Sequence, residues 1–429
     1  MKKRILSVVL AAAMLASMTA CGSSSTTQTT AAPAATTAAA ETQAAAETEA
    51  PAAETEAPAA ETEAPAEAPK PAAGPFNVGI SFASANAWTA QMYAGVEERV
   101  KYWQDQGVIG DYQIVTNTFD PTEQLNQVNA LLSSDIDVLF VSPVSSTSMD
   151  AVVEEAEELG IKVFFSQLEA TCDGTGFVAN SDALGALNAY WFKDKMEKAG
   201  LENGNIIWIS GDDSTFDIQS RMKSATEIFN DQFNVLGRAP GFWNDADASN
   251  ATSTLLSAYG DQVQGIFAED AMTVGIYQAL KNAGYTDDNL PVMTGDNAVA
   301  ALKLAKDIDA DWIGVTNSPY VFCTGIDMGI LCMLGYTFDE SLKQAPLTAP
   351  EGNKTTFYID PPVVVTKDGD RDAMPWMENY PNTEVYSIDE ALALAEELGL
   401  DDSETLALKP TCDFVKSCFV DGDQIPYEW

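Results

Sequence analysis

FNVGISFASANAWTAQMYAG, from Phe76 to Gly95, is the stretch that decides the fold, because the spacer directly before it lacks the apolar residues of a core. The apolar run up to Phe82 predicts a buried strand, and a loop of small residues follows it. Trp88, Met92 and Val96 then recur at helical spacing. Open α/β sheets bind ligands at the carboxyl ends of their strands, so we predict that Trp88 covers a ligand, with core packing as the alternative.

The composition excludes several classes of partner and chemistry. The chain has 429 residues, enough for two lobes, and a formal net charge of −42, which disfavours nucleic acid and anionic lipid as partners. It has no histidine, so the commonest general base is missing, and we expect no enzyme, no metal site and no cofactor. Cys412 and Cys418 are close enough in sequence to close a small disulfide loop, but no CxxC spacing indicates a zinc or redox site.

The first 75 residues carry an export signal and a spacer. Three basic residues, an apolar run and small residues make residues 1–20 a signal peptide. The sequence Met18 to Cys21 resembles the lipobox of bacterial lipoproteins, which predicts lipidation of Cys21; a plain secretory signal is the alternative. Residues 21–75 are rich in Ala, Thr, Glu and Pro, and we expect a disordered tether.

Strands and helices alternate after this tether. Strands are predicted at residues 76–82, 112–118, 137–142, 162–166, 205–210, 234–240, 264–268 and 291–295. Helices of about a dozen residues separate most of them, and no GxGxxG or GxxxxGK[ST] phosphate loop is present. The pattern therefore predicts an α/β fold with two similar parallel-sheet lobes that bind something other than a nucleotide.

Motifs follow one another along this span in the order GISFASANAW, DVLFVSPVSSTSM, IKVFFSQ, GFVANSDALGA, GIFAEDAMTVGIYQAL, PVMTGDN, WIGVTNSP and FYIDPPVVVTKDG. In this order and spacing, the span from Phe76 to about Lys367 resembles the type I periplasmic binding proteins of the ribose/galactose group, the ligand-capturing subunits of ABC importers. The resemblance implies two doubly wound parallel-sheet lobes joined by a three-segment hinge, which close on a ligand like a Venus flytrap.

The resemblance also implies domain boundaries. The N-terminal lobe would comprise residues 76–181 and 318–348, and the C-terminal lobe residues 182–317 and 355–367. The crossings would lie near residues 180–182, near residues 317–319 and between about residues 345 and 357. Residues 368–429 lie beyond the last strand of the family and contain an amphipathic helix at 388–398 that ends at Gly399. We expect a surface-packed extension, with a partner-docking element as the alternative.

Ten residues are implied to line the cleft between the lobes. Aromatic rings would pack on the apolar faces of a sugar, while amides, hydroxyls and carboxylates would bind its hydroxyl groups. The implied ligand-binding residues are Asn86, Trp88, Ser142, Ser145, Gln167, Gln219, Trp243, Asp270, Asp296 and Asn317.

Some positions depart from the family pattern. Relatives that bind ribose usually have an Asp-Arg pair where this chain has Gln167 and Leu168, and another arginine aligns with Gln219, two residues from Arg221. The loop FAEDAM is one residue short, so either Glu269 or Asp270 could face the cleft. With these arginines missing, we expect a neutral carbohydrate.

For some of these residues, a purely structural role is the alternative to ligand binding. Asp296, and Asp182 nearby in NSD, could be helix caps, because Asp and Asn are favoured there. Trp243 could belong to ordinary packing. A glycosidase needs two carboxyl groups, and Asp270 and Asp296 are the candidate pair for that alternative.

The predicted function is that of a monomeric, extracytoplasmic protein that is anchored to the cell membrane by a lipid. It would capture a small neutral carbohydrate and deliver it to the permease of an ABC transporter, without catalysis. The alternative is a sensor of the same fold that signals to a histidine kinase or chemoreceptor.

Overall fold

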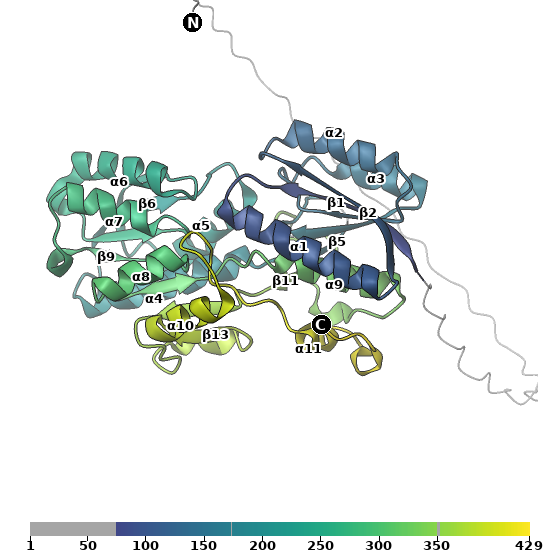
Figure 1. The fold of residues 1–429 in the computed structure, drawn as a ribbon. Coiled ribbons are helices and arrows are strands. Elements are labelled where there is room, and N and C mark those ends of the chain that lie inside the picture. The colour runs from purple at the N-terminus through teal and green to yellow at the C-terminus, as the bar shows by residue number, and fades with distance from the viewer. Residues whose placement is uncertain (1–73, 173, 350–351) are drawn as a thin grey trace, which may run out of the picture. The chain divides into compact units, whose positions relative to one another are not determined.

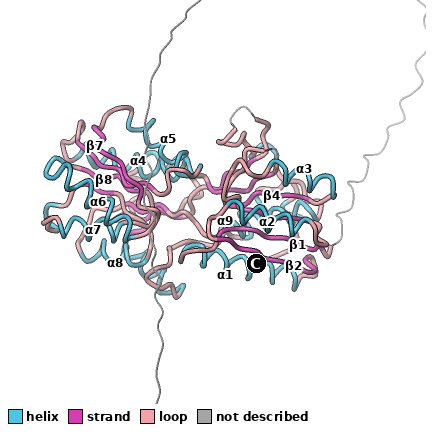
Figure 2. The backbone as a smooth tube through the Cα atoms, turned by 90° about the horizontal axis from the view of Figure 1, so that it is seen from above, coloured by secondary structure: helices cyan, strands magenta, loops and turns pink. Residues whose placement is uncertain are grey.

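The computed structural model describes residues 74–172, 174–349 and 352–429 (Figure 1). The predicted signal peptide, the lipidation site Cys21 and nearly all of the tether lie outside these residues. The strands of the described part form two groups, each with helices around it (Figure 2).

The N-terminal lobe is built on a six-stranded sheet whose neighbouring strands are all parallel. In spatial order the strands are β11 (Thr356–Ile359), β5 (Thr175–Ala179), β4 (Lys162–Gln167), β3 (Val138–Val141), β1 (Phe76–Ala83) and β2 (Ile109–Asn117). The central strands are buried on both faces, as expected from their continuous apolar runs.

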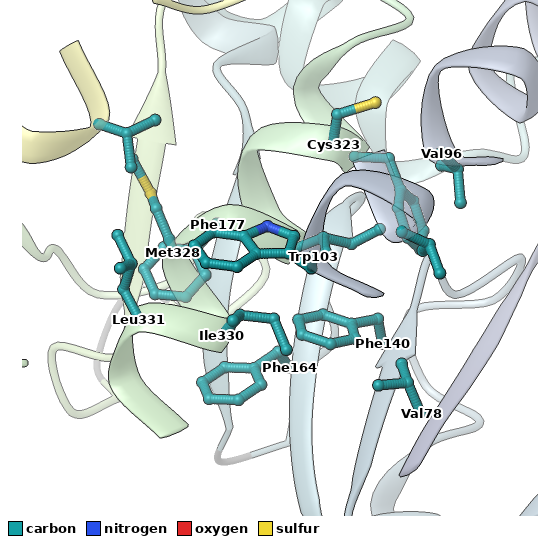
Figure 3. Packing of buried hydrophobic residues seen from close by; sticks show 14 of the residues in the cluster. Val78, Val96, Trp103, Phe140, Phe164, Phe177, Cys323, Met328, Ile330 and Leu331 are labelled. Carbon is teal, nitrogen blue, oxygen red and sulfur yellow. The ribbon is translucent and has the colours of Figure 1, made fainter. Parts of the chain in front are cut away.

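Helices cover both faces of this sheet. The core on one face contains residues of α1 (Ala87–Asp105) and α9 (Val321–Met333), and the core on the other contains residues of α2 (Pro121–Leu132) and α3 (Asp150–Leu159). Figure 3 shows the first of these cores, in which Trp103 of α1 lies near Met328 and Ile330 of α9 and the phenylalanines of the sheet.

The C-terminal lobe has two smaller sheets. The four-stranded parallel sheet has the order β7 (Asn234–Pro240), β6 (Asn205–Ser210), β8 (Gly265–Ala268) and β9 (Val292–Met293). In the three-stranded sheet, β12 (Val363–Thr366) is antiparallel to β10 (Ile313–Val315) and parallel to β13 (Glu384–Ser387). The helices of this lobe are α4 (Ser181–Lys198), α5 (Phe216–Phe229), α6 (Asp245–Tyr259), α7 (Thr273–Asn282), α8 (Val299–Asp307) and α10 (Ile388–Leu398).

Three segments connect the lobes before the extension begins. The first leads from β5 into α4 at Asn180, and the second leads from β10 into α9 at residues 316–320. The third crossing corrects the sequence-based prediction. Residues 356–359, assigned to the C-terminal lobe from sequence, form β11 and pair with β5 of the N-terminal lobe. The chain therefore crosses at residues 360–362, later than the predicted range of 345–357, and Asn180 Nδ2 donates to Asp360 Oδ1 there at 2.8 Å.

The extension contributes to the cores of both lobes. Helix α10 starts with a capping box between Ser387 and Glu390, ends at Gly399 with φ +70°, and packs against α8 of the C-terminal lobe. Further on, α11 (Cys412–Ser417) and the residues after it join the core of the N-terminal lobe. The yellow segment in Figure 1 follows this path from α10 to α11.

Cys412 and Cys418, at the two ends of α11, do not form a disulfide. Both are buried, and each thiol donates to a backbone carbonyl, that of Tyr427 at 3.3 Å and that of Phe414 at 3.4 Å, respectively. The loop that the sequence suggested is thus a short helix with two reduced cysteines.

Candidate functional site

The predicted site residues lie where strands of both lobes end. In the N-terminal lobe, the site residues lie just after β1 and β3 and at the end of β4. Asn86 is the N-cap of α1 and Trp88 is in its first turn, Ser142 and Ser145 are in the loop after β3, and Gln167 is the last residue of β4. In the C-terminal lobe, loops after β7, β8, β9 and β10 carry Trp243, Asp270, Asp296 and Asn317. Gln219 lies instead in the first turn of α5, the helix after β6.

Three of these residues meet at the second crossing. The indole Nε1 of Trp88 donates to the carbonyl oxygen of Asn317 at 2.8 Å, and Gln167 Nε2 lies 3.4 Å from Asn317 Oδ1. Gln167 is buried, its φ is +68°, and its Oε1 has no hydrogen-bond partner. A buried acceptor without a partner is costly, so a polar ligand that donates a hydrogen bond would be stabilised there.

The other residues of the N-terminal lobe have local structural roles. The Asn86 side chain caps α1 and accepts a hydrogen bond from the backbone N–H of Thr89 at 2.9 Å. Ser142 is buried, and its carbonyl accepts from Gln124 Nε2. Ser145 Oγ lies 3.3 Å from another hydroxyl of its own loop, that of Thr147.

Trp243 lies against the backbone of the neighbouring strand-end loop. A Cβ atom added to Gly211, which follows β6, would be 2.3 Å from Cε2 of Trp243, so only glycine allows this approach. Trp243 is half-buried, has a φ of +53°, and is not part of the hydrophobic clusters that form the core of the described residues. Its placement on the loop, rather than in the core, favours the ligand-binding interpretation.

Glu269 and Asp270, which the sequence could not distinguish, have different surroundings. Glu269 accepts a hydrogen bond from Trp208 Nε1 at 2.7 Å, and its other carboxylate oxygen has no partner. Burial raises the pKa of Glu269 to about 8 and that of Asp270 to about 7, and the charge of Arg221 opposes both shifts. Asp270 is also buried and has a φ of +55°, and the negative charge of Asp296 contributes to raising its pKa.

Asp296 is bonded to the backbone on both carboxylate oxygens. Its Oδ2 accepts from the N–H groups of Met272 and Thr273 at the start of α7, and its Oδ1 accepts from that of Ala298. Burial raises its pKa. Asp296 thus binds the start of α7, whereas α8, the helix that follows GDN in the sequence, has Ala298 as its N-cap and no side-chain cap.

Asp182 is not the cap of α4, contrary to the alternative named for it. The N-cap is Asn180, whose Oδ1 accepts from the backbone N–H of Ala183 at 3.0 Å. Asp182 lies in the first turn and accepts from the hydroxyl of Ser220 instead.

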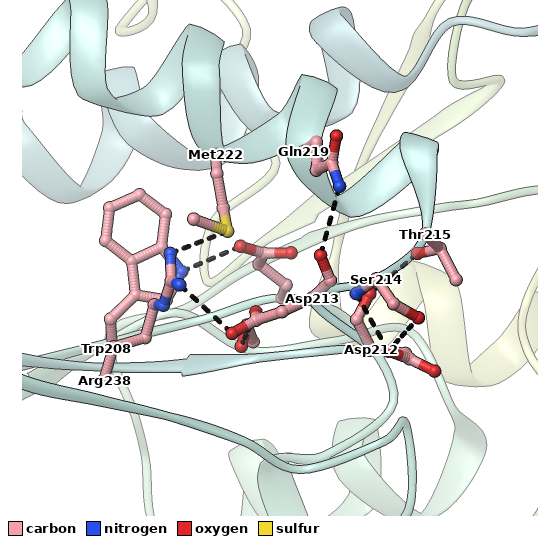
Figure 4. Close-up of polar contacts among 10 residues, drawn as sticks. Trp208, Asp212, Asp213, Ser214, Thr215, Gln219, Met222 and Arg238 are labelled. Carbon is pink, nitrogen blue, oxygen red and sulfur yellow. Dashed lines mark hydrogen bonds and ion pairs between the residues drawn. The ribbon is translucent and has the colours of Figure 1, made fainter.

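Arg221 lies inside the C-terminal lobe rather than on its surface. Its exposed fraction is 2%, its Nη2 is 3.6 Å from Asp217 Oδ2, and its Nε and Nη1 have no partner. Gln219, two residues earlier, donates from Nε2 to the carbonyl of Asp213 at 3.3 Å (Figure 4).

Sequence patterns missed the polar network around this loop. Figure 4 shows Arg238 of β7, whose Nη2 is 3.1 Å from Asp213 Oδ2, close to Trp208. Phe119 and Phe242 were also missed: both follow edge strands, are about half exposed, and have φ values of +63° and +52°. Left-handed backbone at residues other than glycine is strained and concentrates at functional sites, which is a signal that no sequence pattern carries.

No group of three or more His, Cys, Asp or Glu side chains that could hold a metal ion occurs in residues 74–172, 174–349 and 352–429.

The raised carboxyl pKa values predict how stability depends on pH. Glu269, with Arg221, Trp208, Asp217 and Asp213 around it, binds its proton more tightly when folded than when unfolded. The same holds for Asp270, Glu169 and Asp327, each with a pKa of about 7. The tighter proton binding adds to the free energy of unfolding. This stabilisation is complete below the unfolded pKa of about 4 and is lost as the pH rises through 7 to 8. The melting temperature should therefore fall by roughly 5 °C or more between about pH 5 and pH 8.5, as measured by calorimetry. A Glu269→Gln variant should show a smaller fall, and an equal fall would contradict the assignment.

Comparison with known proteins identifies similar sequences. The sequence profile of a family described as periplasmic binding protein domain matches residues 78–330. The ribose import binding protein of Salmonella typhimurium is 28% identical over 198 residues, which cover 44% of this chain and 65% of that protein, just under two thirds of its length. The D-allose-binding periplasmic protein of Escherichia coli is 26% identical over 234 residues, which cover 52% of this chain and 73% of that protein.

Solved structures share the fold. A galactofuranose binding protein superposes with a TM-score of 0.58 at 17% identity, covering 76% of this chain and all of that one. An ABC transporter solute binding protein from Thermobispora bispora gives a TM-score of 0.57 at 19% identity, with 79% and 100% covered. The predicted α/β fold class with two parallel-sheet lobes is thus confirmed.

Proposed function

Because the chain belongs to the periplasmic binding protein domain family, we propose that it captures a small neutral carbohydrate between its lobes and delivers it to an ABC permease. The family consists of extracytoplasmic sugar-binding transport proteins rather than enzymes, so the glycosidase alternative for Asp270 and Asp296 is set aside.

One observation carries the choice of ligand. Buried polar atoms without partners, Gln167 Oε1 and Glu269 Oε2, lie at strand ends of the two lobes, where Trp88 and Trp243 also lie. An amide acceptor and a carboxyl group that can donate or accept, combined with indole rings, suit a molecule with apolar ring faces and hydroxyl groups, which describes a sugar or polyol. The proposed contact residues are the ten predicted from sequence, together with Glu269.

A ligand screen tests this proposal. A thermal-shift screen with neutral sugars, polyols and nucleosides should identify a stabilising carbohydrate, because a ligand at 100 times its Kd adds about 2.7 kcal/mol to the free energy of unfolding. Stabilisation by nucleosides alone, or by nothing in the panel, would contradict it.

Charge should determine selectivity. Arg221 is the cation near Glu269 and Asp270, and its Nη2 lies 3.6 Å from Asp217 Oδ2, so an acidic residue of the same lobe already offsets its charge. We predict by titration calorimetry that a uronic acid binds at least about 100-fold more weakly than the matching neutral sugar, since burying an unpaired charge costs several kcal/mol. Tighter binding of the acid would mean that Arg221 or another cation contacts the ligand.

Membrane attachment is proposed to depend on Cys21. The described residues contain no helix that is long and apolar enough to cross a membrane, and the lipobox-like sequence before Cys21 offers another anchor. Replacing Cys21 with alanine should move the protein from the membrane pellet to the soluble fraction, because acyl chains supply the binding energy. A Ser24→Ala variant is the matched control, and retention of the Cys21→Ala protein in the pellet would show a different anchor.

A further inference from the structure

The lobes are connected by a fourth segment, residues 402–408 of the extension, in addition to the three crossings described above. On one side, α10, which precedes the segment, and Leu406 of the segment itself pack in the core of the C-terminal lobe. After it, Ala407 and Val415 belong to the core of the N-terminal lobe. The chain therefore returns from one lobe to the other at residues 406–408, where Ala407 packs in the N-terminal lobe and its neighbours Leu406 and Leu408 pack in the C-terminal lobe.

On the side of the C-terminal lobe, this segment binds the start of α8. The N-cap residue of α8, Ala298, has no side chain that could cap the helix. The first N–H groups of the helix instead donate to the segment: Val299 to the carbonyl of Glu404 and Ala300 to that of Asp402, both at 3.0 Å. The amide of Leu406 donates to the carbonyl of Asn297 at 2.8 Å, which extends the attachment toward the hinge.

In the hinge itself, the segment contacts the second crossing. Thr316 Oγ1 donates to the carbonyl of Leu406 at 2.9 Å. Thr316 is fully buried and also accepts from Asn297 Nδ2 at 2.7 Å, so the fourth segment shares a hydrogen-bond network with the second crossing.

On the side of the N-terminal lobe, one buried side chain holds the segment. Gln91 of α1 donates from Nε2 to the carbonyl of Thr405 at 3.1 Å, and its Oε1 accepts from the N–H of Thr405 at 3.3 Å. Gln91 is three residues from Trp88, so both lie on the same face of α1 and both contact hinge segments.

We infer that Gln91 is a positioning residue: through its paired hydrogen bonds to Thr405, it couples α1 to the fourth segment and restricts how far the lobes can rotate apart. Rotation must either bend this segment together with the other crossings or separate the Gln91 amide from Thr405. Separation would leave buried donors and acceptors without partners, which disfavours it. The pair therefore narrows the range of lobe orientations in the ligand-free protein.

Distance measurements between the lobes test this inference without a ligand. Spin labels are placed at exposed positions through Glu158→Cys on α3 and Asn250→Cys on α6. Cys21→Ser, Cys172→Ser and Cys332→Ser are present in all samples, and the three remaining native cysteines are buried. Electron–electron resonance on the full chain should give a distance distribution at least about two-fold broader for Gln91→Ala than for the parent protein. Lys409→Ala is the matched control: it removes an exposed ion pair between the extension and Glu98 of α1, and it should leave the width unchanged.

A second variant separates positioning from general loss of stability. A protonated carboxyl has one donor and one acceptor, as the amide pair requires, whereas a carboxylate has no donor. Gln91→Glu should therefore give a narrow distribution at about pH 5 and a broad one at about pH 8, a reversal that damaged packing would not produce. Equal widths for the parent and Gln91→Ala, or a Gln91→Glu width that does not change with pH, would overturn the inference. Neither outcome depends on which ligand the protein binds.

Discussion

Replacing Trp243 with alanine is expected to weaken carbohydrate binding by about 30- to 1000-fold, which corresponds to about 2–4 kcal/mol. The indole is half-buried, rests on Gly211, and lies outside the core clusters, so its removal takes away a flat apolar surface without opening a core cavity. Calorimetry with the sugar from the ligand screen measures the loss, and the melting temperature should change by less than about 3 °C.

Two further changes serve as controls for Trp243. Val235→Ala removes an exposed apolar side chain from β7, the strand that precedes Trp243, and should leave affinity within about two-fold. Gly211→Ala should weaken binding as well, because its Cβ displaces the indole. Trp88→Ala should reduce both affinity and stability, since Trp88 packs against the core of the N-terminal lobe. Unchanged affinity of Trp243→Ala would assign that residue a purely structural role.

Replacing Arg99 with methionine is expected to lower the free energy of unfolding by about 3–5 kcal/mol at pH 8.5. Arg99 Nε is 3.2 Å from Asp327 Oδ2, and the side chains are only 10% and 2% exposed. Without the arginine, the carboxylate of Asp327 is buried with a single hydrogen bond, from Trp103 Nε1. The guanidinium also lies 5.0 Å from the ring centroid of Trp429, so a cation–π contact is lost too.

The pH dependence of this loss identifies its cause. Burial raises the pKa of Asp327 to about 7, so the carboxyl is largely protonated near pH 5 and then requires no counter-charge. Denaturant titrations should therefore show a smaller loss at about pH 5 than at pH 8.5, and Asp327→Asn should partly rescue Arg99→Met. Lys303→Ala breaks the exposed pair with Asp402 and should cost less than about 1 kcal/mol at either pH. An equal loss at both pH values would argue for packing rather than charge.

The alternation of apolar runs and amphipathic helices was sufficient to predict the two lobes and the strand ends that form the candidate site. The third crossing was misplaced although Asp360, Pro361 and Pro362 interrupt the apolar stretch FYIDPPVVV. The break marks the end of a strand, but the sequence does not reveal that the strands on its two sides belong to different sheets. Capping by Asn86 follows a local rule that could have been applied, since Thr89 stands three residues later.

Other features depend on contacts between distant residues and leave no local pattern. The bond between Trp208 and Glu269 joins β6 to the loop after the neighbouring strand β8, and that between Gln91 and Thr405 joins residues 314 positions apart. The strained backbone at Phe242 and Trp243 is likewise set by the surrounding loops rather than by residue type. Trp243 as a ligand contact, opposite Trp88, remains a prediction.

The packing of residues 407–425 in the core of the N-terminal lobe affects the order in which the chain can fold. This core also contains β1, so contacts that complete it span more than 300 positions, and the N-terminal lobe cannot finish folding while the ribosome is still making that segment. A chain that stays incompletely folded until late in synthesis remains extended enough to pass through a secretion channel. For the export signal predicted at residues 1–20, late completion of this core would keep the chain unfolded during translocation.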